Sequence, residues 1–227
     1  MLSLWLGDLD STNEVVRFAA ENALRQIGPP AVPHLRSLLR VESPFTETLK
    51  SWAGRLPLVH YQFVPAYIRQ RQALRAARLL GTQAHGVLPE LKKLLTAALV
   101  TASEGRPAHP FEIIDTLAAL GPEAEPVLTI ALTNNDSSIR WMALLPLARA
   151  ASISSNTLPA LLQVLNESEP PVRELAVQTL GRGAVPPAQI LPILQRFQSD
   201  PDENVRHAAH DAMIRVMQPR ASVTQND

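Results

Sequence analysis

A repeat of 33 residues is the feature that most constrains how this chain can fold. In the C-terminal half, the same spacing separates three successive prolines and three successive arginines, namely Pro126, Pro159 and Pro192, and Arg140, Arg173 and Arg206. A fixed period of this length, with two apolar segments in each unit, is typical of helix pairs that stack one on another.

The proline-containing segments are predicted to form the first helix of each pair, which we call the A helix. They begin at Pro33, Pro89, Pro126, Pro159 and Pro192. An apolar residue follows each proline two positions later, and apolar residues occupy positions five and six, except for Gln198 in the last copy. This is helical spacing, and proline is tolerated in the first turn of a helix because its missing N–H has no partner there.

A second pattern predicts the partner helix, which we call the B helix. Its markers are Val16-Arg17, Ile139-Arg140, Val172-Arg173 and Val205-Arg206, each with an alanine three residues after the arginine and an apolar residue seven after it. Two weaker copies lie at 69–80 and 109–120, aligned through the glycines that follow them, Gly81 and Gly121, as Gly28 follows the first copy. The pattern therefore predicts six B helices, at least five A helices and no β-sheet.

With these residues in place, the segment VRFAAENALRQIGPPAVPHLRSLL, residues 16–39, resembles a HEAT repeat of the short type also found in phycobilin lyase subunits. The resemblance extends over roughly residues 9–218 and implies an all-α, right-handed α-solenoid of antiparallel helix pairs, with about five to six repeats. It also implies a ladder of ion pairs between the arginine of each B helix and an acid in the turn between the helices. The residues six before each arginine are Ser11, Asn134, Glu167 and Asp200, so only a partial ladder is expected.

One segment departs from the period. Pro33 and Pro89 are 56 residues apart, about 23 more than one repeat, which predicts an insertion at about 41–67 in a single solenoid over 1–218, followed by a flexible tail over 219–227. The insertion holds Trp52, Tyr61, Phe63 and Tyr67. It is interpreted either as an extension that covers the first two repeats or as a recognition loop, because long loops often carry function.

The helical period also predicts which B-helix residues face outward. In a HEAT solenoid this outer stripe lines the concave groove. The candidate partner-binding residues on it are Phe18, Arg71, Arg75, Arg78, Phe111, Ile114, Trp141, Leu144 and Leu145. An apolar patch at the centre of this groove would indicate an interaction site, and burial by a neighbouring helix is the alternative.

The basic residues of the candidate groove suggest a kind of partner. No acid lies between Glu47 and Glu90, whereas six basic residues do, Arg71, Arg75 and Arg78 among them. This group could hold an acidic peptide or a phosphate backbone, or could be an ordinary solvated helix face.

Composition and motifs exclude several other classes. Cysteine is absent, which rules out disulfides and thiolate metal sites, and no nucleotide-binding, hydrolase or metalloprotease motif occurs. None of the six histidines precedes a glutamate, as the histidines of HEAT-like di-iron hydroxylases do. His207, His210 and Asp211 share a helix face but lack further ligands, so we expect neither cofactor nor metal, and no enzymatic activity.

The sequence gives weaker indications of cellular location. No window of 18 apolar residues is present and the N-terminus lacks a basic start, so neither a membrane span nor a signal peptide is expected. These features predict a cytoplasmic protein, although a targeting segment could be missing from this chain.

The leading hypothesis is therefore a non-catalytic scaffold that binds another protein or peptide along the concave B-helix surface. One alternative is an accessory subunit resembling phycobilin lyases. The other is a nucleic-acid-binding protein resembling the HEAT-like alkylpurine glycosylases, against which the balance of 21 basic and 21 acidic residues argues.

Overall fold

The computed structural model describes residues 2–41, 46, 48, 52, 64–100, 109–150, 153–166, 169–183 and 185–218. The chain divides into two compact units, Met1–Val127 and Leu128–Asp227, and the division falls within helix α8 (Glu125–Leu132). Most of the predicted insertion and the predicted tail lie outside the described residues. The expectation of one solenoid over 1–218 remains a prediction.

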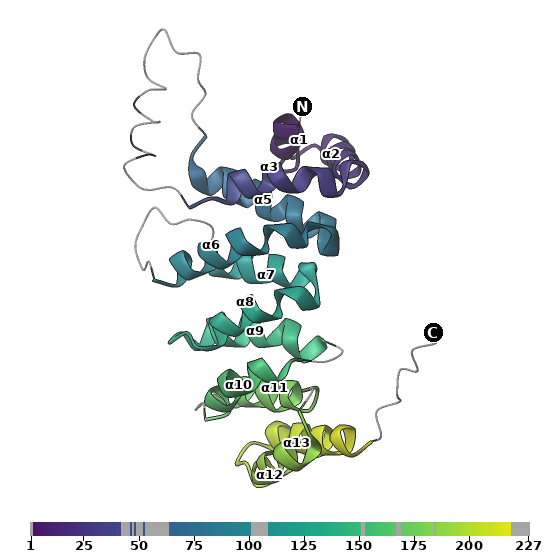
Figure 1. The fold of residues 1–227 in the computed structure, drawn as a ribbon, viewed down its shortest axis with the longest axis vertical. Helices are drawn as coiled ribbons and strands as arrows, with labels where there is room; N and C mark the ends of the chain where they lie inside the picture. The colour runs from purple at the N-terminus through teal and green to yellow at the C-terminus, as the bar shows by residue number, and fades with distance from the viewer. Residues whose placement is uncertain are drawn as a thin grey trace. The chain divides into compact units, whose positions relative to one another are not determined.

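Each unit consists of helix pairs, which confirms the predicted all-α solenoid architecture (Figure 1). The B helices are α2 (Glu14–Ile27), α5 (Ala66–Leu80), α7 (Pro110–Leu120), α9 (Ser137–Arg149), α11 (Pro170–Leu180) and α13 (Glu203–Met217). The A helices are α3 (Val32–Leu39), α6 (Leu88–Val100), α8, α10 (Leu158–Val164) and α12 (Pro187–Phe197), and α1 (Leu2–Asp8) precedes the first B helix. The described residues contain no β-strand, only one isolated bridge between Ile153 and Gly183.

The prolines set the start of most A helices as predicted. Pro33, Pro89, Pro126 and Pro159 each occupy the second position of their helix. The expectation is wrong for Pro192, which is the sixth residue of α12, because Pro186 and Pro187 provide an earlier start and the helix continues through Pro192. Two apolar residues four apart, Ile190 and Leu194, are both buried, so packing of this face outweighs the hydrogen bond that Pro192 cannot donate.

Three glycines end the first three B helices. Gly28, Gly81 and Gly121 have φ values of 62°, 57° and 83°, in the region that residues with a Cβ rarely adopt. A 3₁₀ segment that begins at Gly81, or directly after Gly28 and Gly121, leads into the next A helix. These glycines therefore make possible the tight turn from a B helix to the following A helix.

The alanine of the B-helix pattern lies at the centre of each repeat. Ala20, Ala143, Ala176 and Ala209 have no exposed surface. In the N-terminal unit α5 packs against α3 and α7, and in the C-terminal unit α11 packs against both α9 and α13. Because the B helices contact one another as well as their A helices, only a small side chain fits at this position.

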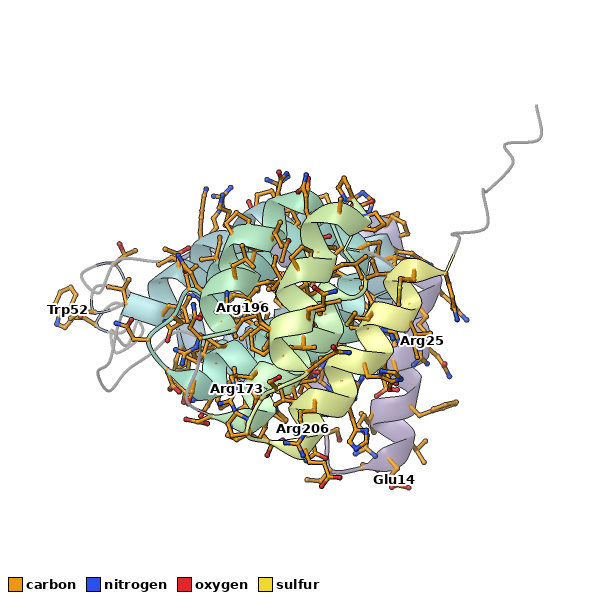
Figure 2. All side chains as sticks on the ribbon, turned by 90° about the horizontal axis from the view of Figure 1, so that it is seen from below. Glu14, Arg25, Trp52, Arg173, Arg196 and Arg206 are labelled. Carbon is orange, nitrogen blue, oxygen red and sulfur yellow. The ribbon has the colours of Figure 1, made fainter. Side chains whose placement is uncertain are left out.

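One rung of the predicted ladder is present in the C-terminal unit. The Arg173 guanidinium donates two hydrogen bonds to the Asp200 carboxylate, at 3.0 and 2.8 Å, and both side chains are nearly buried. Arg173 is labelled in Figure 2. This pair links α11 to the turn before α13. The hydrogen bonds from Arg173 lower the pKa of Asp200 below its ordinary value.

The other three pattern arginines each donate a hydrogen bond to the backbone of the preceding turn. Arg17, Arg140 and Arg206 each donate to the carbonyl oxygen six residues earlier, at 3.3, 2.5 and 2.9 Å. They therefore close the turn before their own helix, and the acid position Glu167 lies outside the described residues.

We expect Ala176→Leu to destabilise the protein by roughly 1–3 kcal/mol, because the larger side chain cannot fit between α11 and its neighbours without moving them. Chemical denaturation measures this change. Ala188→Leu is the matched control, since Ala188 lies exposed on α12 and its replacement should change the stability little. Equal stability of the two variants would contradict the central role of this alanine.

We expect Asp200→Asn to destabilise the protein at neutral pH by about 1.5–3 kcal/mol, the usual contribution of hydrogen bonds to a charged group. The pKa of Asp200 is lowered in the folded state, so its contribution is full above the ordinary carboxyl pKa of about 4 and is lost as the pH falls through the folded value. The stability difference between wild type and variant should therefore shrink in acid. Denaturation curves from about pH 7 to about pH 3 test this, and a difference that stays constant would contradict it.

Candidate binding surface

The outward-facing position of each B helix lies two residues after the start of its pattern. It is occupied by Phe18, Arg71, Phe111, Trp141, Glu174 and His207. Phe18 on α2 is 63% exposed and Trp141 on α9 is 38% exposed, whereas Phe111 on α7 is half-buried. The structure therefore places an accessible aromatic side chain on a B helix of each unit.

Two predicted surface residues belong to the core instead. Ile114 is only 1% exposed and Leu144 is 0% exposed, so the expectation that they form an exposed patch is wrong. The prediction treated each B helix as buried on one side. In the stack, a helix such as α9 or α7 also packs against a neighbouring B helix, which widens the buried arc. Leu145, the next residue on α9, is half-buried.

The three predicted arginines of α5 all bind carboxylates of neighbouring elements. The shortest contacts join Arg71 to Glu112 at 3.2 Å, Arg75 to Asp10 at 3.2 Å, and Arg78 to Asp115. Arg75 also lies 3.9 Å from Glu21, a residue of α2 that pairs with Arg25 at 3.8 Å. This set of four arginines and four acids, which we call the α5 ion-pair network, has no net charge.

The α5 ion-pair network changes the interpretation of the basic segment. The arginines are clustered along the sequence, but the acids that neutralise them come from the turn before α2 and from α2 and α7. These residues therefore do not form an uncompensated basic patch. Attraction of an acidic partner segment remains a prediction.

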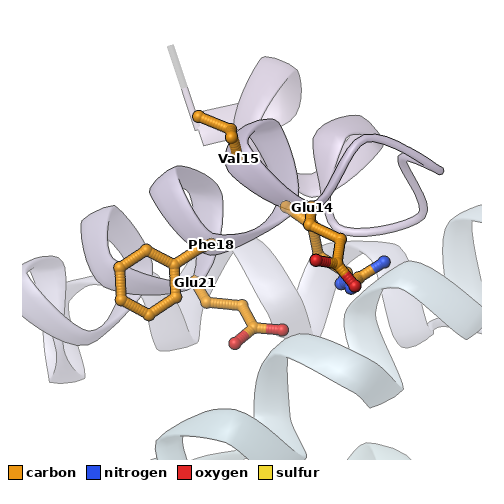
Figure 3. Close-up of a pocket in the computed structure, with 5 residues that line it drawn as sticks. Glu14, Val15, Phe18 and Glu21 are labelled. Atoms are coloured by element: carbon orange, nitrogen blue, oxygen red, sulfur yellow. The ribbon is translucent and has the colours of Figure 1, made fainter.

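An open depression of about 590 Å³ lies on α2 beside Phe18 (Figure 3). Its lining residues are Glu14, Val15, Arg17, Phe18 and Glu21. Val15 is 77% exposed, and the outward-stripe prediction missed it because it lies one residue before the pattern begins. Asn13, whose side chain accepts from the backbone N–H of Val15, is the sequence signal that could have placed the helix start there.

The histidines of α13 show no ligand cluster. His207 lies 3.5 Å from Glu203, and both side chains are largely exposed. No group of three histidine, cysteine or acidic side chains within the described part of the chain is arranged to hold a metal ion. Among the same residues, no helix is both long enough and apolar enough to cross a membrane.

Comparisons with known proteins agree with this architecture. Residues 158–223 match the family model of HEAT repeats. A computationally designed armadillo repeat protein for modular peptide recognition superposes with a TM-score of 0.50 at 17% identity, covering 95% of this chain and 99% of its own. Human deoxyhypusine hydroxylase in complex with glycerol gives a TM-score of 0.45 at 20% identity, covering 95% and 84%. No curated protein matches the sequence.

The fold and the matched residues define a helical-repeat protein of the HEAT and armadillo type. Residues 158–223 match HEAT repeats in sequence, and the helix pairs of both units have the same α-solenoid architecture.

We expect Arg75→Gln to destabilise the protein by less than about 1 kcal/mol, because exposed ion pairs contribute little in water and salt screens them. The difference from wild type should be largest at low ionic strength. Denaturation at low and high salt measures this, and a large loss that does not depend on salt would show that Arg75 acts through packing.

Proposed function

We propose that the protein is a non-catalytic scaffold that binds another protein or peptide through the outward faces of its B helices. The observation that carries this proposal is the pair of accessible aromatic side chains, Phe18 on α2 and Trp141 on α9, at equivalent positions of the repeat. Partly exposed aromatics in soluble proteins are frequent anchors of interfaces because they bury a large area at little conformational cost.

The charge of the N-terminal unit favours a protein or peptide over nucleic acid as the partner. The arginines of α5 that could have met a phosphate backbone are paired with carboxylates of the same unit. Phosphate binding normally depends on an excess of positive charge, which the α5 ion-pair network does not provide. The peptide-recognition purpose of the designed armadillo protein is consistent with a protein or peptide partner.

The depression on α2 supplies a place for an apolar partner side chain in the N-terminal unit. Val15 and Phe18 form its apolar part, and Glu14 and Glu21 lie beside them. A partner segment with an apolar anchor would therefore find both contact area and hydrogen-bond acceptors on the same helix. An acidic partner segment would have to displace carboxylates from the α5 arginines, so we expect charge to contribute less than apolar contact.

The competing location is the insertion at about 41–67. The described residue Trp52 of this segment is 61% exposed. A partner that recognises this segment would not depend on the B-helix aromatics, so the two locations can be separated by experiment.

Peptides selected from a random library against the folded protein provide a probe for this surface. We expect Trp141→Ala to weaken binding of peptides held at α9 by roughly 2 kcal/mol or more, as for an interface hot spot, and Phe18→Ala to do the same for peptides held at α2. Arg75→Ala should have a smaller effect that fades as salt rises. Isothermal titration measures each affinity.

The matched control is Gln163→Ala, which alters an exposed residue of the A helix α10 and should leave binding unchanged. A deletion of residues 44–64, checked for folding by circular dichroism, tests the insertion. Loss of binding in that deletion, together with unchanged affinity in both aromatic variants, would move the site from the B helices to the insertion.

A further inference from the structure

The first and last B helices expose large apolar side chains. On α2 these are Val15, Val16 and Phe18, and on α13 they are Ile214, which is 41% exposed, and Met217, which is 59% exposed. The other exposed large apolar side chains of the described residues are Val41, Trp52, Val64, Tyr67, Val100 and Trp141. Val41, Trp52, Val64 and Val100 belong to or directly border stretches that the structure does not describe, and Tyr67 lies in the predicted insertion. Val15, Val16, Phe18 and Ile214 lie within the described B helices α2 and α13, and Met217 is the last residue of α13.

The packing of α13 on α11 shows what such faces contact inside the C-terminal unit. Gly181, at the end of α11, lies so close to Ala212 that a Cβ on the glycine would be 2.7 Å from the alanine Cβ. Val205 and Ala208 are seven and four residues before Ala212, on the same face of α13, and all three are buried. We call Val205, Ala208 and Ala212 the receiving face of α13.

Helix α2, which packs against α1 and α5, carries a face of the same composition that the described residues leave largely exposed. Its segment VRFAAENAL, residues 16–24, matches VRHAAHDAM of α13, residues 205–213, at five of nine positions. The equivalents of the three receiving residues are Val16, Ala19 and Ala23. Val16 and Ala19 are exposed and Ala23 is half-buried, whereas their counterparts in α13 are at most 6% exposed.

Helix α13 carries the complementary face, which the described residues leave exposed. Gly181, directly after α11, faces α13, and Val177 lies one helical turn before it. The residues one repeat of 33 later are His210 and Ile214. Both are exposed, and Met217 lies on the next turn. We call His210, Ile214 and Met217 the presenting face of α13.

We propose that copies of this protein associate head to tail, with the presenting face of α13 in one copy packed on Val16, Ala19 and Ala23 of α2 in the next. The contact would repeat between molecules the stacking that joins α11 to α13 within one molecule. The small side chains Ala19 and Ala23 leave room for Ile214, which is larger than the glycine at the equivalent position of α11, so the two helices would lie somewhat further apart than α11 and α13.

This arrangement has a consequence that other self-association modes do not share. The two contacting faces differ, so a chain of associated copies has one unpaired face at each of its two ends. Growth therefore gives open chains or closed rings rather than a symmetric dimer. The inference concerns the stacking faces and does not depend on the outward-facing aromatics of the proposed function.

Sedimentation velocity of the wild-type protein from about 1 μM to about 1 mM tests the proposal, and we expect the average mass to rise with concentration. Ala19→Arg blocks the α2 face and Ile214→Arg blocks the α13 face, so each variant alone should stay monomeric where wild type assembles. An equimolar mixture should form dimers and nothing larger, because each variant retains the face that the other lacks.

Ala118→Arg is the matched control, since Ala118 is exposed on α7 outside both faces, and it should assemble like wild type. Circular dichroism checks that every variant is folded. A wild type that stays monomeric throughout, a folded single variant that assembles like wild type, or a mixture that gives no dimers would each overturn the proposal. A folded single variant that assembles like wild type would indicate a symmetric contact through the face that this variant leaves intact.

Discussion

The close approach of successive B helices is the interaction on which the rest of this structure depends. The alanine of each B pattern is fully buried, and in the C-terminal unit Gly181 lets α11 come nearly into backbone contact with Ala212 of α13. Such spacing buries B-helix residues on both sides as well as against the A helix. It leaves only a narrow outward face, and that is where the accessible aromatics lie.

This geometry explains how much of the fold could be predicted. The period, the proline positions of four A helices and the buried alanines follow from local spacing, because each repeat solves the same packing problem. The outward face was predicted less well. A helical wheel divides a helix into two sides, but Ile114 and Leu144 are buried on a third side that only the neighbouring repeat creates. The repeat spacing also predicts a helix start at Pro192, but Pro186 and Pro187, which the spacing does not include, start α12 earlier.

The basic run in the sequence also gave a wrong expectation of surface charge, because residues from other parts of the chain pack beside it. The residues between Glu47 and Glu90 form a basic run along the chain, yet Arg71, Arg75 and Arg78 meet acids that are 37 to 65 residues away in sequence. The electrostatic neighbours of these three arginines belong to other helices and turns of the stack and not to their own segment. Local charge along the sequence therefore says little about the charge of the surface.

The first and last repeats of a stacked array differ from the inner repeats because each has one face that no neighbouring repeat covers. One B-helix position shows this clearly. It is buried and apolar in the inner repeats, as Leu74, Ile114, Leu144 and Val177, and is polar in the first and last, as Glu21 and His210. The polar side chain is exposed at His210 and partly exposed at Glu21. The receiving face of α2 shows no such change, since Val16 and Ala19 are the same residue types as the buried Val205 and Ala208. A face that keeps the composition of a buried interface while exposed loses the free energy of burial unless another helix covers it.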